Sequence, residues 1–282
     1  MIEGEPSRTA DRVALERAVH QLIDTPLVLA DPLAIRMLPP EDAERLSEHP
    51  DRHDASPVAR PIRATVVARS RIAEDELSRA TAAGVTQYVL LGAGLDTFAY
   101  RNPHQGVRVF EVDQPSTQQL KRERLTAAGI AIPETMTFVP FDFRAQTLPA
   151  VLDAAGFDRQ KPAVFAWLGV VMYLDRIIVR DTLRFVASLP AGTAVVFDYA
   201  LPPAEVHWLV RFFYRQALKM FANQGEPWIC FFTPVSLRLL LDEVGFREID
   251  DLGAGELNRR FFANRHDGLK AYQVVRIAVV RR

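Results

Sequence analysis

The sequence contains only one cysteine, Cys230, among its 282 residues. A disulfide within the chain and a multi-cysteine metal site each need at least two thiols, so both are excluded. We therefore expect no metal site. The lack of disulfides is typical of proteins in reducing compartments, which predicts a cytoplasmic location.

The sequence also lacks an excess of charge and a long apolar run. Its 34 Lys and Arg residues against 35 Asp and Glu residues give a formal net charge of −1, so no overall field attracts nucleic acid or acidic lipid. The longest apolar run, residues 163–174, is shorter than the roughly 18 residues that cross a bilayer. Glu3 and Glu5 stand where a secretory signal would carry basic residues. We expect a small-molecule partner, no nucleic acid, no membrane and no export signal; the oligomeric state stays open.

The order of the expected elements predicts an α/β fold. After residue 84, short segments rich in β-branched and aromatic residues alternate with helical segments, as in βαβ units. The expected strands are residues 87–91, 108–112, 137–139, 163–168, 193–199, 247–250 and 272–280. The expected helices between them are residues 115–128, 145–155, 175–188 and 234–244. The sequence therefore predicts a doubly wound, mostly parallel seven-stranded sheet.

Two further regions flank or interrupt this pattern. Helical periodicity over 11–23 and 62–82 predicts an N-terminal helical cap comprising residues 1–83, followed by a ligand-binding domain at 84–282. The five prolines between residues 38 and 61 oppose regular structure and predict a surface loop. The segment 200–233 is rich in aromatic residues, which either wall an acceptor pocket as an inserted lid or fill the core.

A glycine-rich turn follows the first expected strand. The apolar strand leads directly into Gly92, Ala93 and Gly94. Glycine lets a ligand approach the main chain closely, as in nucleotide-binding turns. A dinucleotide-binding GxGxxG turn would need glycine where Thr97 stands, whereas S-adenosyl-L-methionine (SAM) has no phosphate and tolerates polar residues such as Asp96 there. The pattern favours SAM, with a nicotinamide dinucleotide as the alternative.

Acidic residues stand near the ends of the next two expected strands. Asp113 follows Gly92 by 21 residues, a spacing suited to a carboxylate that accepts hydrogen bonds from ribose hydroxyls. Glu111 lies on the same face of the strand, and we prefer Asp113 because it lies at the strand end. Asp142 follows the third strand and is expected to bind the amine of adenine, with Phe143 packing nearby; a helix-capping aspartate is the alternative.

With these residues assembled, the sequence resembles the leucine carboxyl methyltransferase family, in particular its bacterial SAM-dependent O-methyltransferases of polyketide and other secondary metabolism. The similar motifs lie between about Ser7 and Tyr199 and are Arg8-Thr9-Ala10, Arg17-Ala18, Asp31-Pro32-Leu33-Ala34, Ala68-Arg69-Ser70-Arg71, Leu91-Gly92-Ala93-Gly94-Leu95-Asp96-Thr97, Phe110-Glu111-Val112-Asp113-Gln114-Pro115 and Met172-Tyr173-Leu174. The resemblance implies a class I, Rossmann-like methyltransferase domain in which Arg69 pairs with the methionyl carboxylate of the cofactor. The implied cofactor-binding set is Arg69, Gly92, Ala93, Gly94, Asp96, Asp113, Gln114, Asp142, Phe143 and Leu168.

The sequence departs from the family at Leu168, where many relatives carry glutamate. The expected activity is transfer of a methyl group to a carboxylate or hydroxyl of a small, apolar or aromatic acceptor. A hydroxyl acceptor would benefit from a general base, for which His207, Tyr199 and Asp198 are candidates. A nicotinamide-dependent oxidoreductase, a methyltransferase acting on protein C-terminal carboxylates and a non-catalytic SAM binder remain as alternatives.

Overall fold

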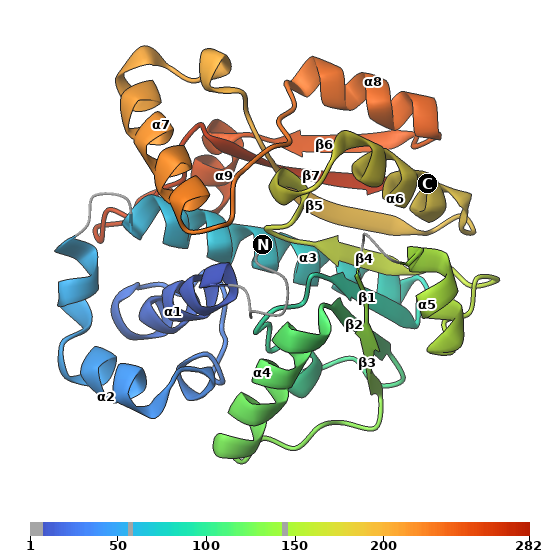
Figure 1. Cartoon of the computed structure of the whole chain (residues 1–282), viewed down its shortest axis with the longest axis horizontal. Coiled ribbons are helices and arrows are strands. Elements are labelled where there is room, and N and C mark those ends of the chain that lie inside the picture. The colour runs from blue at the N-terminus through green and yellow to red at the C-terminus, as the bar shows by residue number, and fades with distance from the viewer. Residues whose placement is uncertain (1–7, 56–58, 143–145) are drawn as a thin grey trace.

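A computed structural model describes residues 8–55, 59–142 and 146–282. Its centre is a seven-stranded sheet in the order β3-β2-β1-β4-β5-β7-β6 (Figure 1). The strands are β1 (Gln87–Leu91), β2 (Arg108–Asp113), β3 (Met136–Pro140), β4 (Val164–Trp167), β5 (Ala194–Ala200), β6 (Glu248–Leu252) and β7 (Val275–Arg281). The first five strands pair in parallel, and β7 runs antiparallel to both β5 and β6. The predicted doubly wound, mostly parallel sheet is confirmed.

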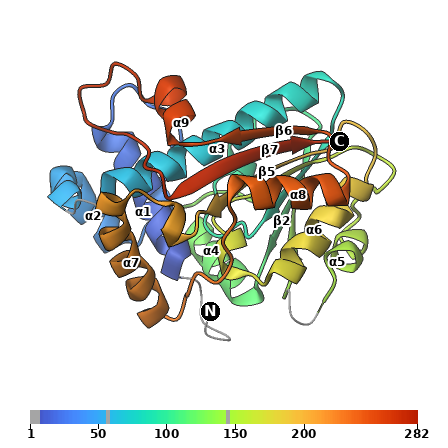
Figure 2. The same ribbon diagram turned by 90° about the horizontal axis from the view of Figure 1, so that it is seen from above.

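Helices cover both faces of this sheet. They are α1 (Arg8–Ile23), α2 (Pro40–Glu48), α3 (Ala59–Ala82), α4 (Pro115–Ala127), α5 (Leu148–Ala154), α6 (Arg176–Ser188), α7 (Trp208–Asn223), α8 (Pro234–Val244) and α9 (Ala254–Phe261). Figure 2 shows α3 on one side of the sheet and α6 and α8 on the other. Among the described residues, no helix is both long and apolar enough to span a membrane.

The two covered faces explain the uninterrupted apolar sequence of the central strands. In β1, Tyr88 and Leu90 belong to the core cluster beneath α3, whereas Val89 and Leu91 belong to the cluster that includes α6 and α8. Successive side chains of a strand point to opposite faces, so a strand covered on both sides needs an apolar residue at every position. The carboxyl ends of the parallel strands are thereby fixed at one edge of the molecule.

The predicted surface loop at residues 38–61 is wrong. The segment contains α2, a short 3-10 helix (Pro50–Ala55) and the start of α3. Apart from Pro57, which lies outside the described residues, its prolines stand at helix beginnings: Pro39 precedes α2, Pro40 and Pro50 open their helices, and Pro61 lies in the first turn of α3. Proline is tolerated there because the first backbone N–H groups of a helix have no partner within it. Counting prolines without their positions therefore gave the wrong result. The short α9 was not predicted.

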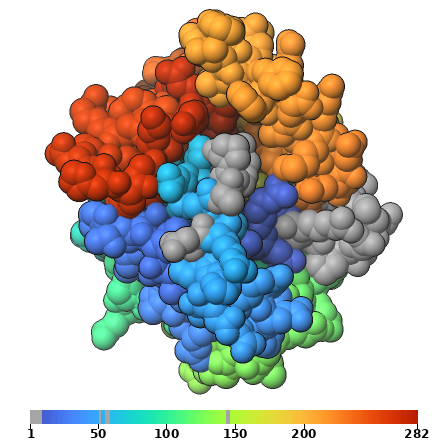
Figure 3. All heavy atoms as spheres, turned by 90° about the vertical axis from the view of Figure 1, so that its left-hand side faces the viewer, coloured from blue at the N-terminus to red at the C-terminus, as the bar shows by residue number. Residues whose placement is uncertain are grey.

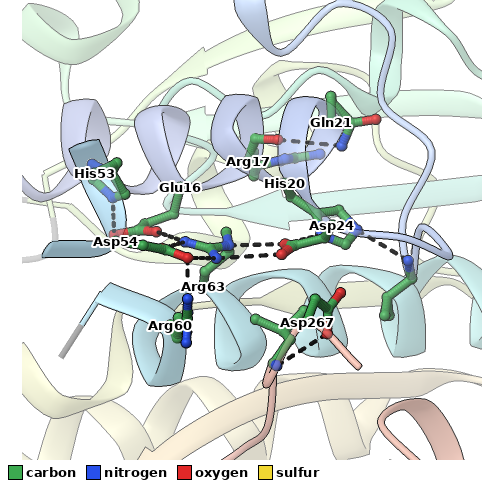
Figure 4. A network of polar contacts seen from close by, with 12 residues as sticks. Glu16, Arg17, His20, Gln21, Asp24, His53, Asp54, Arg60, Arg63 and Asp267 are labelled. Atoms are coloured by element: carbon green, nitrogen blue, oxygen red, sulfur yellow. Dashed lines mark hydrogen bonds and ion pairs between the residues drawn. The ribbon is translucent and has the colours of Figure 1, made fainter. Parts of the chain in front are cut away.

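A buried polar network joins the first helices (Figure 4). The Arg63 side chain, 1% exposed, donates from Nε to Asp24 Oδ2 at 2.8 Å and from Nη1 to Asp54 Oδ1 at 2.8 Å. His53 Nε2 lies 2.9 Å from Glu16 Oε1. This hydrogen bond raises the pKa of His53, against the opposing effect of its partial burial. The network ties α1, the 3-10 helix and α3 together through charged groups rather than apolar packing.

Candidate functional site

A cavity lies at the carboxyl ends of β1, β2 and β4, the place where open α/β sheets bind ligands. α1, α3 and the loop after α7 contribute the remaining walls. Its lining residues are Thr9, Ala10, Val13, Arg17, Arg69, Ser70, Leu90, Leu91, Gly92, Ala93, Gly94, Leu95, Asp96, Asp113, Gln114, Thr117, Phe141, Ala166, Leu168, Gly169, Val170, Tyr173, Leu174 and Glu226. The structure therefore brings eight of the ten predicted cofactor residues to one cavity: Arg69, Gly92, Ala93, Gly94, Asp96, Asp113, Gln114 and Leu168.

The glycine turn forms the floor of this cavity. Gly92 has φ +70° and Gly94 has φ +50°, a backbone region that side chains disfavour. A Cβ atom at Gly92 would also collide with the side chain of Val170. The backbone N–H groups of Gly92 and Ala93 donate to the carbonyl of Val112 at 2.8 and 3.2 Å. Both φ and space thus require glycine at Gly92, and the turn is held against the end of β2.

Asp113 is fixed beside this turn by two backbone donors. Its Oδ2 accepts from Gly94 N at 2.6 Å and its Oδ1 accepts from Gln114 N at 2.7 Å. Burial raises the pKa of Asp113, and these hydrogen bonds oppose that effect. A carboxylate oxygen accepts more than one hydrogen bond, so each oxygen retains capacity for a donor from a ligand. The arrangement suits a pair of neighbouring hydroxyls.

Glu111 belongs to a different environment. Its carboxylate is buried and lies 2.8 Å from Lys121 Nζ of α4, and Tyr100 also donates to it. Burial raises the pKa of Glu111 to about 7, although the Lys121 ammonium lowers it. Glu111 does not line the cavity. Of the two acids on this strand face, the geometry brings Asp113 to the cavity, in line with the preference for the strand end.

Arg69 is held at the cavity wall by Asp198. Its Nη1 donates to Asp198 Oδ2 at 2.8 Å, and Asp198 Oδ1 accepts from Gly169 N at 2.5 Å. The guanidinium lies directly against Gly169, where an added Cβ would come within 2.7 Å of Arg69 Nη2. A fixed guanidinium at the wall is suited to pairing with a carboxylate of a ligand.

Asp96 lines the cavity but already has a strong partner. Its carboxylate accepts from Arg17 Nη1 at 2.5 Å and from Phe98 N at 2.7 Å. Burial raises the pKa of Asp96, but the positive charges of Arg17, Lys121 and Arg101 and the hydrogen bond from Phe98 N together outweigh burial and lower the pKa to about 2. Arg17 also contacts Asp31 at 3.0 Å. Asp96 therefore stays ionised and ties α1 to the glycine turn.

The predicted adenine contacts were Asp142 and Phe143. Asp142 is not among the lining residues, and its backbone N–H lies 3.2 Å from Gln146 Oε1. Phe143 lies outside the described residues. Phe141, which was not predicted, lines the cavity on this side.

None of the three candidate bases is among the residues that line the cavity. His207 is exposed at the start of α7. The Tyr199 hydroxyl donates to Asp251 at 2.9 Å, on the side of β5 that meets β7. Asp198 is fully buried and occupied by Arg69 and Gly169. The alternation of side chains between the two faces of β5 does not show which hydrogen-bond partners Asp198 and Tyr199 have.

Three polar residues at the cavity were not predicted to belong to the site. Glu226, 7% exposed, lies in the loop after α7, and its carboxylate accepts from the hydroxyl of Thr9. The Tyr173 hydroxyl lies 3.3 Å from Thr9 Oγ1. Thr9 and Tyr173 belong to motifs shared with the family, which was the available signal. Nothing in the local sequence pattern distinguishes Glu226.

Comparisons with known proteins identify this arrangement. Residues 10–187 match the sequence pattern of leucine carboxyl methyltransferases. The YktD protein of Bacillus subtilis, whose name describes a SAM-dependent methyltransferase, is 33% identical over 98% of this chain and 97% of its own. A Frankia alni protein similarly named is 36% identical over 67% of each chain.

Solved structures agree on the fold. A Streptomyces avermitilis protein of the DUF574 family covers 100% of both chains with a TM-score of 0.60 and 16% identity. A Thermobifida fusca protein described as a methyltransferase also has a TM-score of 0.60, with 15% identity over 100% of this chain and 96% of that chain. At such identities only the fold is shown, and it is that of class I methyltransferases. The family match and the relatives show that the chain belongs to the leucine carboxyl methyltransferase family and is a SAM-dependent methyltransferase.

Proposed function

We propose that the enzyme transfers the methyl group of SAM to an oxygen, in a hydroxyl or a carboxylate, of a small apolar acceptor. The observation that carries the proposal is the polar group of Thr9, Tyr173 and Glu226 at a cavity wall that is otherwise largely apolar. A hydroxyl there can donate to an acceptor oxygen and the Glu226 carboxylate can accept from an acceptor hydroxyl, while the apolar lining suits the rest of a nonpolar molecule.

The residues at the two sides of the glycine turn fit the cofactor. Asp113 ends β2 and offers its carboxylate to the ribose hydroxyls, and Arg69 lies against Gly169 after β4, with its guanidinium suited to the methionyl carboxylate. β1 lies between β2 and β4 in the sheet. The cofactor would therefore extend across the glycine turn from Asp113 to Arg69.

SAM supplies a methyl group on a positively charged sulfur, which is displaced in line by the acceptor oxygen. The chain has to align that oxygen and exclude water. α1 and the loop after α7 meet over the cavity, where Thr9 donates to Glu226 and Arg12 Nη2 lies 3.4 Å from Gln224 Oε1. We assign this closing role to α1, from the expected cap (residues 1–83), and to the loop after α7, from the expected lid (200–233).

The residues at the cavity also determine which kinds of acceptor oxygen can react. A carboxylate acceptor is already nucleophilic at neutral pH, whereas an alcohol or phenol must lose its proton. Neither His207 nor Tyr199 reaches the cavity to take that proton. The Tyr173 hydroxyl would donate to either kind of oxygen, whereas the one proton of the Thr9 hydroxyl is donated to Glu226. Acceptors of both kinds therefore belong in the test.

The test begins with mass spectrometry of the purified protein, where retained SAM or S-adenosylhomocysteine is expected. The enzyme is then incubated with methyl-labelled SAM and two acceptors of similar shape, 2-naphthol and 2-naphthoate. Methyl esters release methanol in alkali and methyl ethers do not, so the lability of the product identifies the oxygen. Methylation of 2-naphthylamine or 2-naphthalenethiol, with neither oxygen acceptor methylated, would contradict O-methylation.

A variant pair tests the assignment of Arg69. Arg69→Lys keeps a positive charge for Asp198 but loses the planar, two-pronged guanidinium, and roughly tenfold weaker SAM binding is expected. Arg71→Lys is the matched control on the same helix, since Arg71 pairs with Asp75 and does not line the cavity. Equal SAM affinity in both variants would argue against the role of Arg69.

A further inference from the structure

One helix of this enzyme is packed on one side only. α7 contacts the core through Val210, Tyr214 and Leu218, and the Tyr214 hydroxyl donates to the carbonyl of Leu201 at 2.9 Å. These three residues recur every four positions and therefore lie on one face of the helix. Tyr214 is the buried residue of α7. The rest of the helix surface faces away from the core.

The opposite side of α7 carries large apolar side chains. Four of them are more than half exposed: Trp208 (69%), Leu209 (56%), Phe212 (63%) and Phe213 (62%). Positions i, i+1, i+4 and i+5 share one side of a helix. In Figure 3 the orange segment that includes α7 stands at the rim of the molecule, uncovered on this face. Single exposed apolar residues are common, but a cluster of this kind marks an interaction site.

A row of basic side chains borders this apolar side. Arg211, Arg215 and Lys219 follow each other at four-residue spacing, and the 16 residues of α7 contain no Asp or Glu. At 100° per residue Arg211 and Arg215 lie between the core-facing side and the apolar side, and Lys219 lies at the edge of the apolar side. Arg211 donates to the carbonyls of Ala204 and Val206 at 2.9 and 3.0 Å.

We propose that α7 docks the enzyme on the surface of an anionic lipid bilayer. Helices that lie in the bilayer interface combine Trp and Phe on one side with Lys and Arg beside them. Basic residues near an anionic surface attract it within about one Debye length, roughly 8 Å at physiological salt. The formal net charge of −1 for the whole chain does not oppose this, because the local charge of α7 is what meets the lipid. The expectation of no membrane partner came from the net charge and from the lack of a spanning run, and neither describes a single surface helix.

The docking helix is joined directly to the cavity. Arg12 of α1 lies 5.3 Å from the ring of Phe221 near the end of α7, and the loop after α7 brings Glu226 to the cavity wall. A bilayer under α7 would therefore lie beside the entrance used by an acceptor. On the proposed function, on which this step rests, acceptors that dissolve in lipid are favoured.

Vesicle binding tests the docking without any knowledge of the acceptor. The full chain is sedimented with vesicles of phosphatidylcholine alone or with one quarter phosphatidylglycerol. Binding is expected only with phosphatidylglycerol and should fall as salt is raised. Trp208 is 69% exposed, whereas Trp167 is fully buried and Trp228 is largely covered, so a blue shift of tryptophan fluorescence on binding reports α7. No sedimentation with anionic vesicles at low salt would overturn the proposal.

Paired variants locate the contact on α7. Phe212→Ser with Phe213→Ser, and separately Arg215→Glu with Lys219→Glu, should each lower the vesicle partition coefficient by at least tenfold. Val235→Ser with Leu239→Ser is the matched control, because these α8 side chains are 70% and 65% exposed and lie on another helix. All variants should bind SAM like the wild type, which shows that they are folded and keeps this test separate from the proposed function. Equal loss in the control, or protection of Trp208 by self-association in solution, would overturn the assignment.

Discussion

Replacing Asp113 by asparagine should weaken the binding of both SAM and S-adenosylhomocysteine. Both carboxylate oxygens accept backbone hydrogen bonds, from Gly94 N at 2.6 Å and from Gln114 N at 2.7 Å. An asparagine side chain offers one oxygen and one NH2 group, so one of these backbone donors would face another donor. The variant therefore loses a turn contact as well as the charged acceptor for the ribose.

The expected magnitude follows from these contacts. A hydrogen bond to a charged group contributes about 1.5 to 3 kcal/mol, which corresponds to roughly 10- to 100-fold in dissociation constant. Asp113→Ala removes the same acceptor without adding a misplaced donor and should fall in the same range. Because the ribose is common to both ligands, their affinities should fall by similar factors.

Isothermal titration calorimetry at several pH values is the assay. Burial raises the pKa of Asp113 against the opposing backbone hydrogen bonds, and only the ionised form is a full acceptor. Wild-type affinity should therefore fall on acidification at a higher pH than for an exposed aspartate, and Asp113→Asn should lack this dependence. Asp158→Asn is the control, since Asp158 also accepts a backbone N–H, from Gln160, but lies away from the cavity. An Asp113→Asn variant with wild-type affinity and wild-type stability would refute the ribose assignment.

Three further substitutions test the surroundings of the cavity and the cap. Gly169→Ala would place a Cβ 2.7 Å from Arg69 Nη2 at φ +74°, so we expect roughly tenfold weaker SAM binding by calorimetry and a stability loss of about 1 to 2 kcal/mol from the backbone. Arg63→Ala leaves buried carboxylates without their partner and should lower the free energy of unfolding by about 3 to 5 kcal/mol in urea. The raised pKa of His53 means that its contact stabilises the fold fully below the unfolded pKa of about 6.5 and is lost as the pH rises through the higher folded value. The melting temperature of the wild type should therefore approach that of His53→Gln at alkaline pH.

Each of these predictions has a matched control. Gly84→Ala carries a similar backbone penalty at φ +92° with nothing within 4 Å of the new Cβ, so SAM affinity should not change; a change as large as in Gly169→Ala would contradict the steric argument. Arg45→Ala removes an ion pair of a 73% exposed side chain and should cost under about 1 kcal/mol. A constant stability difference between wild type and His53→Gln across the pH range would contradict the titration of that contact.

The central strands could be predicted because their burial on both sides leaves a continuous apolar pattern. β1 was expected at residues 87–91 and is observed there, and α8 likewise matches 234–244. The glycine turn was equally readable, since only glycine fits a positive φ beside Val170. The prediction for residues 38–61 was wrong because proline is tolerated in the first turn of a helix but disrupts the interior of a helix. The sequence does not show where a helix begins, so it does not show which of the two effects a given proline has.

The sequence alone determined the succession of the seven strands, the turn at Gly92 and the acid at Asp113, because each depends on residues close together in the chain. The tertiary structure alone decided the partners of the long charged side chains. In the folded protein Glu111 pairs with Lys121, Asp198 pairs with Arg69, and Glu226 accepts a hydrogen bond from Thr9. Such pairs join segments far apart in the sequence, and their geometry is fixed only when the sheet and its covering helices have packed.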